Sequence, residues 1–283
     1  MIKDHFHTNR PTYSIEVFPP KKEADVSTIY EALDEFKFLQ PDFISVTYGA
    51  GGTTVENTFA IANYIQNQCR IEALCHLTCA AIPNPLFLNN FLTNLYRNGI
   101  HNLLPLRGDQ PQGMSREEFN ARYYEHASDL VCDVKKAYDF CVAGACYPEV
   151  HPEAASAEED IRNLKTKVDA GVDFLTTQLF YDNDVFYRFM ERVRAVGIDV
   201  PVLAGLMPVT SYKQISNIIR LSGTKIPDAF MSDLERFRDS DADIKKVSID
   251  FIRRQMSDLL AHGVSGIHLY SMNKVDIAKA IFD

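Results

Sequence analysis

Two kinds of hydrophobic spacing alternate along this chain of 283 residues. Short apolar runs, several of them alternating with polar residues, predict β-strands, because successive strand side chains point to opposite faces. Between them, apolar residues recur every three or four positions, as in amphipathic helices. The predicted strands are 13–18, 43–47, 71–78, 102–107, 140–147, 174–179, 200–206 and 266–270. The predicted helices lie near 25–38, 55–68, 85–97, 122–137, 157–170, 183–195, 211–220, 243–261 and 274–282.

The order of these elements predicts an α/β fold, the (β/α)8 TIM barrel. Eight strands, each followed by a helix, suit a closed parallel sheet with its helices outside. Residues 221–242 are extra and acidic, and we interpret them as an insertion before the eighth strand. No repeat or low-complexity linker divides the chain, so we expect one catalytic domain over residues 1–283.

Strand alternation assigns side chains to the two faces of the predicted sheet. In the first strand Ile15 and Val17 share a face that suits the helices, so Glu16 points into the barrel. A buried carboxylate costs free energy unless it is paired, hydrated or protonated. Glu16 is therefore either a catalytic group or part of an ion pair that closes the barrel. The same alternation sends further polar side chains inward: Thr47, His76, Gln178, His268 and Tyr270.

Composition narrows the function classes. The net charge is −9, from 29 basic and 38 acidic residues, which argues against a general nucleic-acid binder. The first residues lack the apolar core of a signal peptide, and no apolar run approaches the roughly 20 residues that span a bilayer. We therefore expect a cytoplasmic protein with no membrane partner. The six cysteines form no CxxC pair, and Cys75 and Cys79 face away from His76, so we predict free core thiols and no metal site.

The predicted fourth strand ends abruptly in Arg107, Gly108 and Asp109. Catalytic groups of α/β barrels sit at the carboxyl ends of the strands, so this cation, flexible residue and anion indicate a site. The alternative is an ordinary Arg–Asp pair in a turn. After the second strand, residues 49–54 read GAGGTT, where Thr54 replaces the third glycine of a dinucleotide fingerprint. We interpret them as a turn that lets backbone approach a ligand.

The segment ACYPEVHPEA, residues 145–154, follows the fifth strand and carries two prolines that stiffen it. Ser156 and Glu159 then form a capping-box pattern that begins a helix. Asp160, Asn163 and Lys167 share one face of that helix. Alone, this face would be ordinary solvated surface. Beside a stiff loop at a strand end, it becomes a candidate for binding the polar tail of a ligand.

With these segments assembled, the chain resembles methylenetetrahydrofolate reductase over nearly its whole length. The motifs are SIEVFPPK at 14–21, SVTYGAGGT at 45–53, HLTC at 76–79, LRGD at 106–109 and YPEVHPEA at 147–154. The resemblance implies a barrel that carries FAD tightly but non-covalently. It implies reduction of 5,10-methylenetetrahydrofolate to 5-methyltetrahydrofolate with NADH or NADPH, in one-carbon metabolism and methionine synthesis. It also implies a homo-oligomer, and the length matches the short bacterial form.

The resemblance implies roles for particular residues. Glu16 matches the family's general acid, and Asp109 matches a carboxylate near flavin and pterin. The substrate-binding positions are Glu16, Gln178, Gln214, Ile218 and Lys274. The FAD-binding positions are Thr47, His76, Leu106, Arg107, Gly108, Asp109, His126, Ala127, Tyr147, His151, Asp160, Asn163 and Lys167.

Four positions depart from the family pattern. Ile218 replaces a phenylalanine that lines the substrate site, and Lys274 replaces an arginine near the folate tail. Lys274 keeps the charge but lacks the planar fork that binds a carboxylate bidentately. His126 replaces a tyrosine beside the flavin, and Thr166 replaces a basic residue near the cofactor phosphates. The departures concern substrate affinity and nucleotide preference, and they leave the reaction class unchanged.

The chemistry agrees with these roles. The imidazolidine ring of the substrate opens to an iminium only when the departing nitrogen is protonated. An acid whose pKa is raised by an enclosed site suits that task, and we expect Glu16 to be such an acid. Asp109 can favour the cationic iminium electrostatically. Two alternatives stay open: a barrel that uses a related pterin or a deazaflavin, and a flavin-binding subunit that needs a partner for electron delivery.

Overall fold

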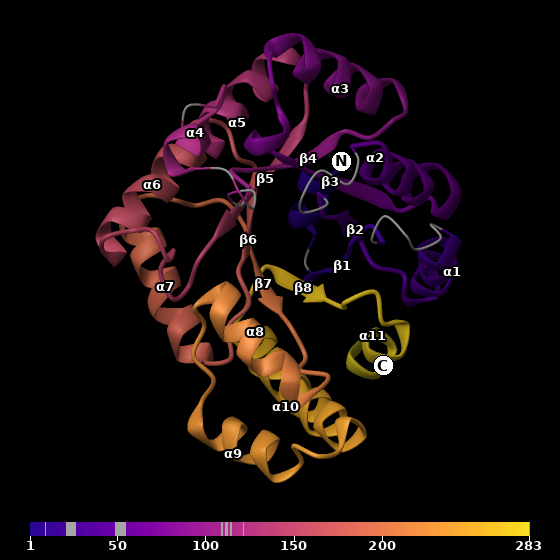
Figure 1. Ribbon diagram of the computed structural model, residues 1–283, viewed down its shortest axis with the longest axis vertical. Helices are drawn as coiled ribbons and strands as arrows, with labels where there is room; N and C mark the ends of the chain where they lie inside the picture. Colours follow the sequence, from indigo (N-terminus) through magenta and orange to yellow (C-terminus); the bar gives the residue numbers. More distant parts are fainter. Residues whose placement is uncertain are drawn as a thin grey trace.

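The computed structural model describes residues 1–8, 10–20, 27–48, 55–108, 110, 113, 115–120 and 122–282, and its strands close into a barrel. All eight predicted strands are present, each parallel to the next, and β8 closes the barrel on β1 (Figure 1). The predicted single-domain TIM barrel is confirmed. The strands are β1 (Thr12–Val17), β2 (Phe43–Val46), β3 (Glu72–Thr78), β4 (Asn102–Leu106), β5 (Cys141–Cys146), β6 (Phe174–Thr177), β7 (Val202–Leu206) and β8 (Gly266–Tyr270).

Helices surround the strands, as Figure 1 shows. The α-helices are α1 (Ser27–Phe36), α2 (Val55–Tyr64), α3 (Pro85–Arg97), α4 (Arg116–Asn120), α5 (Ala127–Ala137), α6 (Ala157–Asp169), α7 (Asn183–Ala195), α8 (Tyr212–Ser222), α9 (Asp228–Arg236), α10 (Asp241–Ala261) and α11 (Val275–Phe282). The helix predicted near 122–137 begins only at Ala127, because His126 has extended backbone and forms its N-cap. The helix predicted near 55–68 changes at Ile65 into a π-helical turn that ends at Cys69. Inside the predicted insertion, α9 packs beside α10 at the edge of the molecule.

The two faces of the barrel wall divide as strand alternation predicts. Ile15 and Val17 are fully buried in the apolar layer between strands and helices, together with Cys75. Glu16 and His76 lie on the other face and line the barrel interior. All six cysteines are free, as predicted, and all but Cys132 are buried.

The amino-terminal end of the barrel is filled by apolar side chains. The short 3-10 helix η1 (Ile2–His7) lies against this end, and Ile2 is fully buried among Phe43, Leu74 and Phe174. The backbone N–H of Ile2 donates a 2.9 Å hydrogen bond to Oδ1 of Asn102, at the start of β4. We call this apolar end, formed by Ile2, Phe43, Leu74, Leu104, Cys141, Ala143, Phe174 and Leu203, the barrel floor.

Two features are absent from the described residues. No helix there is long and apolar enough to cross a membrane. No group of three or more His, Cys, Asp or Glu side chains there could hold a metal ion.

Candidate functional site

A cavity of about 1730 Å³ opens at the carboxyl ends of the strands, opposite the barrel floor. Its wall includes Glu16 from β1, His76 from β3, Thr176 from β6 and His268 from β8. Loops and helices extend it outward as far as α6. We call it the mouth cavity.

The structure brings most of the predicted site residues together in the mouth cavity. Those that line it are Glu16, Thr47, His76, Leu106, Arg107, Gly108, His126, Ala127, Tyr147, His151, Asp160, Asn163, Lys167 and Gln178. Asp109 and residues 49–54 lie outside the described residues. The structure therefore assembles one site from strands and loops that are far apart in sequence.

Three predicted substrate residues do not line the mouth cavity. Oε1 of Gln214 accepts hydrogen bonds from N–H and Oγ1 of Thr210, at 2.8 and 2.9 Å. Nζ of Lys274 donates to the same Oγ1 at 3.1 Å. Ile218 is 4% exposed, so its side chain packs into the apolar layer between barrel and helices. Gln214 and Lys274 thus meet at Thr210, beyond the end of β7.

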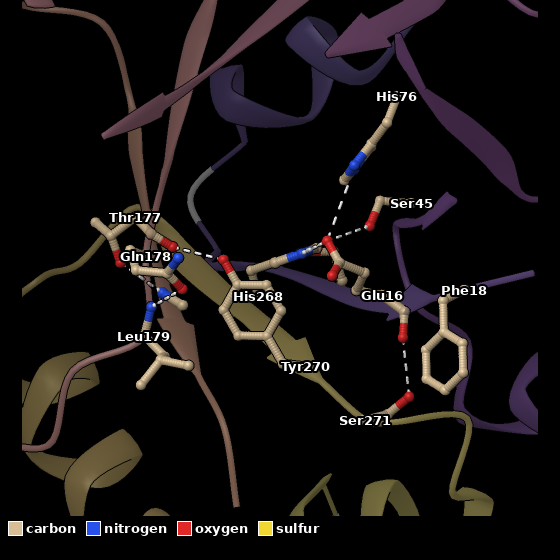
Figure 2. A network of polar contacts seen from close by, with 12 residues as sticks. Glu16, Phe18, Ser45, His76, Thr177, Gln178, Leu179, His268, Tyr270 and Ser271 are labelled. Atoms are coloured by element: carbon tan, nitrogen blue, oxygen red, sulfur yellow. Dashed lines mark hydrogen bonds and ion pairs between the residues drawn. The ribbon is translucent and has the colours of Figure 1, made fainter. Parts of the chain in front are cut away.

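The carboxylate of Glu16 is the centre of a polar cluster inside the barrel (Figure 2). Nε2 of His268 lies 3.4 Å from its Oε2, and Oγ of Ser45 donates to the same oxygen at 3.4 Å. Nε2 of His76 lies 3.6 Å from that oxygen, beyond a hydrogen bond. The Glu16 side chain is 19% exposed, on the side of the mouth cavity.

The expectation that enclosure raises the pKa of Glu16 is wrong for this structure. Burial does act to raise it, but the hydrogen bond with His268 and the nearby imidazole of His76 outweigh burial, so the pKa of Glu16 lies below its ordinary value. Burial also lowers the pKa of His76 to about 4, against the carboxylate of Glu16. His76 is therefore neutral at pH 7, and contacts with His268 and Ser45 favour the ionised form of Glu16. Strand alternation identified the inward face but not these neighbours.

Two further side chains, Tyr270 and Gln178, line the mouth cavity beside this cluster (Figure 2). The hydroxyl of Tyr270 donates a 2.7 Å hydrogen bond to the carbonyl of Thr177, and burial raises its pKa well above the usual value. Oε1 of Gln178 accepts from the backbone N–H of Leu179 at 2.9 Å. These bonds fix both side chains at the cavity wall.

The loop 147–154 is held by more than its prolines. The carboxylate of Glu149 accepts from the backbone N–H of Lys225 at 3.1 Å and from the hydroxyl of Thr224. Val150 has φ of 77°, a left-handed conformation that strains a β-branched residue. The surrounding bonds hold this strained backbone in place, as is common at functional sites.

The polar face predicted on α6 does point into the mouth cavity. Oδ2 of Asp160 accepts from the backbone N–H of His151 at 3.0 Å, and burial raises the pKa of this carboxyl. Nζ of Lys167 donates to the carbonyl of Ala145 at 2.8 Å, and burial lowers the pKa of this ammonium. Ser156 caps the helix, since its Oγ accepts from N–H of Glu159 at 3.2 Å, as predicted. The face combines a cation, an anion and the amide of Asn163 at the cavity edge.

The N-terminus of α5 forms another part of the cavity wall. His126, Ala127 and Ser128, at the N-terminus of α5, line the mouth cavity. Free backbone N–H groups and the helix dipole make such an end suitable for a phosphate group. Nearby, Arg107 forms a 2.6 Å ion pair with Glu153.

Sequence reasoning missed part of the site. His268 and Ser45 bind Glu16 directly, and Ser14 lies behind His268 with Oγ 2.7 Å from its Nδ1. Alternation did point His268 inward, but Ser14 became a contact only because barrel closure sets Ser14 opposite His268. Thr176 was also missed, and its buried Oγ1 has no hydrogen-bond partner among the described residues.

The chain is similar to known proteins over nearly its whole length. A sequence profile of the family described as methylenetetrahydrofolate reductase matches residues 1–283. The chain is 37% identical to 5,10-methylenetetrahydrofolate reductase of Escherichia coli (strain K12), over 95% of this chain and 88% of that protein. It is 36% identical to methylenetetrahydrofolate reductase (NADH) 1 of Arabidopsis thaliana, over 96% of this chain and 48% of that protein. The chain thus spans about half the length of the plant relative.

A solved structure supports the fold assignment but no assignment of function. An uncharacterized protein from Clostridium thermocellum, described as binding two copies of 5-methyl-5,6,7,8-tetrahydrofolic acid, superposes with a TM-score of 0.65. The match covers 99% of this chain and 96% of that chain, at 16% identity.

Proposed function

Because this chain belongs to the methylenetetrahydrofolate reductase family, we propose that it reduces 5,10-methylenetetrahydrofolate to 5-methyltetrahydrofolate with NADH or NADPH through one non-covalently bound FAD. The product would serve one-carbon metabolism and methionine synthesis. The observation that carries the proposal is the position of Glu16, a carboxylate inside the barrel that faces the mouth cavity and is hydrogen-bonded to His268 and Ser45.

The residues of the mouth cavity fit a flavin dinucleotide. Nε2 of His76 and Oγ1 of Thr176 are buried polar atoms without a hydrogen-bond partner among the described residues, and a polar ring system would supply one. Lys167 and the N-terminus of α5 are suited to the charged part of such a ligand. FAD, when bound, would carry hydride from the nicotinamide nucleotide to the folate. The remaining predicted contacts, Asp109 included, are proposed on the family pattern.

Glu16 is the proposed general acid, and the structure indicates how its proton affinity could change. In the free site its contacts favour the ionised carboxylate. A pterin ring in the mouth cavity would displace water from the exposed 19% of the side chain, and further burial raises a carboxyl pKa. Substrate binding would therefore promote protonation of Glu16 where the departing nitrogen needs the proton. Gln178, which lines the same cavity, is proposed to contact the pterin.

Gln214, Ile218 and Lys274 remain proposed substrate residues, although none lines the mouth cavity. Gln214 and Lys274 both form hydrogen bonds with Thr210, and Lys274 is exposed. We therefore propose that they contact the charged tail of the folate. A homo-oligomer in the cytoplasm is proposed on the family pattern alone.

Both substrates are proposed to use the same site in turn. The mouth cavity opens at one end of the barrel and is large, so nucleotide and folate would reach one flavin from the same side. Steady-state rates should then give parallel double-reciprocal lines, the pattern of ping-pong kinetics.

Titration of the protein with FAD tests the proposal. We expect one FAD per chain, released on denaturation, and parallel lines in the steady state. Protein that fails to bind FAD contradicts the flavin assignment. Intersecting lines contradict a shared site.

A further inference from the structure

The loop 147–154 is joined to residues 222–225, at the start of the predicted insertion. The backbone N–H of Lys225 donates to the carboxylate of Glu149, whose two oxygens both lie 3.1 Å from the nitrogen. The hydroxyl of Thr224 donates to the same carboxylate. Thr224 is 2% exposed, so its contact with Glu149 is shielded from water. The loop after β5 is therefore tied to a segment 75 residues further along the chain.

Thr224 also reaches the segment after β6 that carries Gln178. Its Oγ1 lies 3.3 Å from the carbonyl oxygen of Leu179. The backbone N–H of Leu179 in turn donates to Oε1 of Gln178 at 2.9 Å (Figure 2). Both Gln178 and Leu179 line the mouth cavity. One buried hydroxyl thus lies between Glu149, on the loop after β5, and the residue next to a predicted folate contact.

The end of α8 holds Thr224 in this position. Oγ of Ser222 accepts from the backbone N–H of Thr224 at 3.2 Å and donates to the carbonyl of Ile218 at 2.7 Å. Gly223 has φ of 70°, a conformation that glycine adopts without strain, and it turns the chain out of the helix. Thr224 is therefore fixed to the helix that carries two predicted substrate residues, Gln214 and Ile218.

The Thr224 hydroxyl has one hydrogen and two acceptors within reach. A charged acceptor forms the stronger hydrogen bond, so the carboxylate of Glu149 receives it. Without the carboxylate, the hydroxyl can donate to the carbonyl of Leu179 alone, and the loop loses its connection. Without the hydroxyl, Glu149 keeps its bond to Lys225, but the contact with Leu179 is lost. The two side chains are parts of one connection.

We propose that Glu149 and Thr224 are positioning residues for the folate: they fix the distance between the loop 147–154 and the Gln178 side chain. The inference rests on the proposed function, since it requires that the flavin lies against this loop and that Gln178 contacts the folate. Its effect is on the geometry between cofactor and substrate.

The loop has other supports that do not involve Thr224. The backbone N–H of His151 donates to Asp160, on α6, at 3.0 Å. A guanidinium nitrogen of Arg192, on α7, donates to the carbonyl of Pro148 at 3.3 Å. The predicted FAD contacts of the loop therefore keep these supports when the connection is broken. Folate binding should weaken more than FAD binding.

Thr224→Val and Thr224→Ser form a matched pair, because Val removes the hydroxyl at similar volume and Ser keeps it. In Thr224→Val we expect the KM for the folate to rise about tenfold at unchanged kcat, as loss of one hydrogen bond that supports binding implies. The Kd of FAD and the rate of flavin reduction by NADH should stay close to those of wild type. Thr224→Ser should have the wild-type KM.

Ser240→Ala is the control for a general loss of stability. Ser240 caps α10 in the same insertion, where its Oγ accepts from the backbone N–H of Asp243 at 3.3 Å. Loss of this cap should lower the free energy of unfolding and leave the KM for the folate unchanged. Equal rises of KM in Ser240→Ala and Thr224→Val would show that KM follows stability, and would overturn the proposal.

A double-mutant cycle with Glu149→Ala and Thr224→Val tests whether the two side chains act through each other. If they do, the KM of the double variant should equal that of the more impaired single variant, and the two effects should not multiply. Multiplied effects would overturn the connection. If Glu149→Ala does not fold, the comparison of Thr224→Val with Thr224→Ser still decides.

Failure of this inference is distinct from failure of the proposed function. An active wild type with an unchanged KM in Thr224→Val would overturn the positioning role and leave folate reduction intact. Wild-type protein that does not reduce the folate would overturn the proposed function, and this inference with it.

Discussion

The two ends of the barrel are built from the same strands and satisfy their polar groups in different ways. At the floor, Asn102 accepts from N–H of Ile2 and donates to Glu72 and to the carbonyl of Ala73. At the mouth, Nε2 of His76 and Oγ1 of Thr176 are buried without hydrogen-bond partners among the described residues. Buried polar atoms without partners cost free energy, so the mouth gives up stability that a bound ligand can restore.

This difference shows which part of each strand contributes to stability and which part contributes to the site. The inward side chains near the start of the strands are apolar, as in Phe43 and Phe174. Those nearer the end are polar, as in Glu16 and Thr176. This agrees with the general division of such barrels into a stabilising face and an active face.

The largest expected effect concerns the floor. Phe174 is fully buried and its ring contacts those of Phe6 and Phe43, with centroids 5.1 and 5.9 Å away. Phe174→Ala should lower the free energy of unfolding by about 3–5 kcal/mol, as loss of a buried aromatic ring does. Urea unfolding measures this.

The same variant also tests whether the barrel floor contributes to stability without contributing to ligand binding at the mouth. FAD affinity of the folded Phe174→Ala protein should stay near that of wild type. A loss of FAD affinity without a loss of stability would contradict the division between floor and mouth.

The next effect is the pH dependence of stability that His76 causes. Its pKa is about 4 in the folded protein and near 6.5 when exposed, so the unfolded chain takes up the proton first as pH falls. This contribution is complete above about pH 6.5 and is lost as pH falls towards 4, by about 3 kcal/mol. Unfolding free energies at several pH values measure it. His76→Gln should flatten this part of the profile, and an unchanged profile would show that His76 is not buried as a neutral ring.

Substitution of Glu16 should separate the two half-reactions. Hydride transfer from NADH to flavin needs no proton for a leaving nitrogen, so in Glu16→Gln flavin reduction should persist within about tenfold, a barrier change of about 1.4 kcal/mol. Reoxidation by 5,10-methylenetetrahydrofolate should slow at least ~10²-fold, as loss of a general acid does. Stopped-flow absorbance measures both. Equal losses in the two half-reactions, with a fall in thermal stability, would make Glu16 a structural residue.

The smallest effect distinguishes polar groups at the two ends. Thr176→Val removes a buried hydroxyl without a partner at similar volume, so unfolding free energy should stay the same or rise by up to about 1 kcal/mol. The matched control, Asn102→Val at the floor, removes three hydrogen bonds and should lower it by about 1–3 kcal/mol. Similar losses of unfolding free energy in both variants would contradict the difference between the floor and the mouth.

The sequence predicted the barrel because its strand and helix periods are distinct, and it predicted Glu16 and His76 as inward because a strand has a period of two. It could not predict that His268 binds Glu16, since 252 residues separate them and only barrel closure sets the register of β8 on β1. The sign of the Glu16 pKa shift was missed for the same reason. Gln214 and Lys274 were predicted from the family pattern, which does not reveal that both contact Thr210.

The central claim is that the mouth cavity holds one flavin which the nucleotide reduces and the folate reoxidises. The absorption spectrum of the anaerobic, FAD-loaded protein tests it most directly. The account predicts that NADH or NADPH bleaches the flavin band and that 5,10-methylenetetrahydrofolate restores it, with one 5-methyltetrahydrofolate formed per FAD. A reduced flavin that the folate leaves unchanged would contradict it.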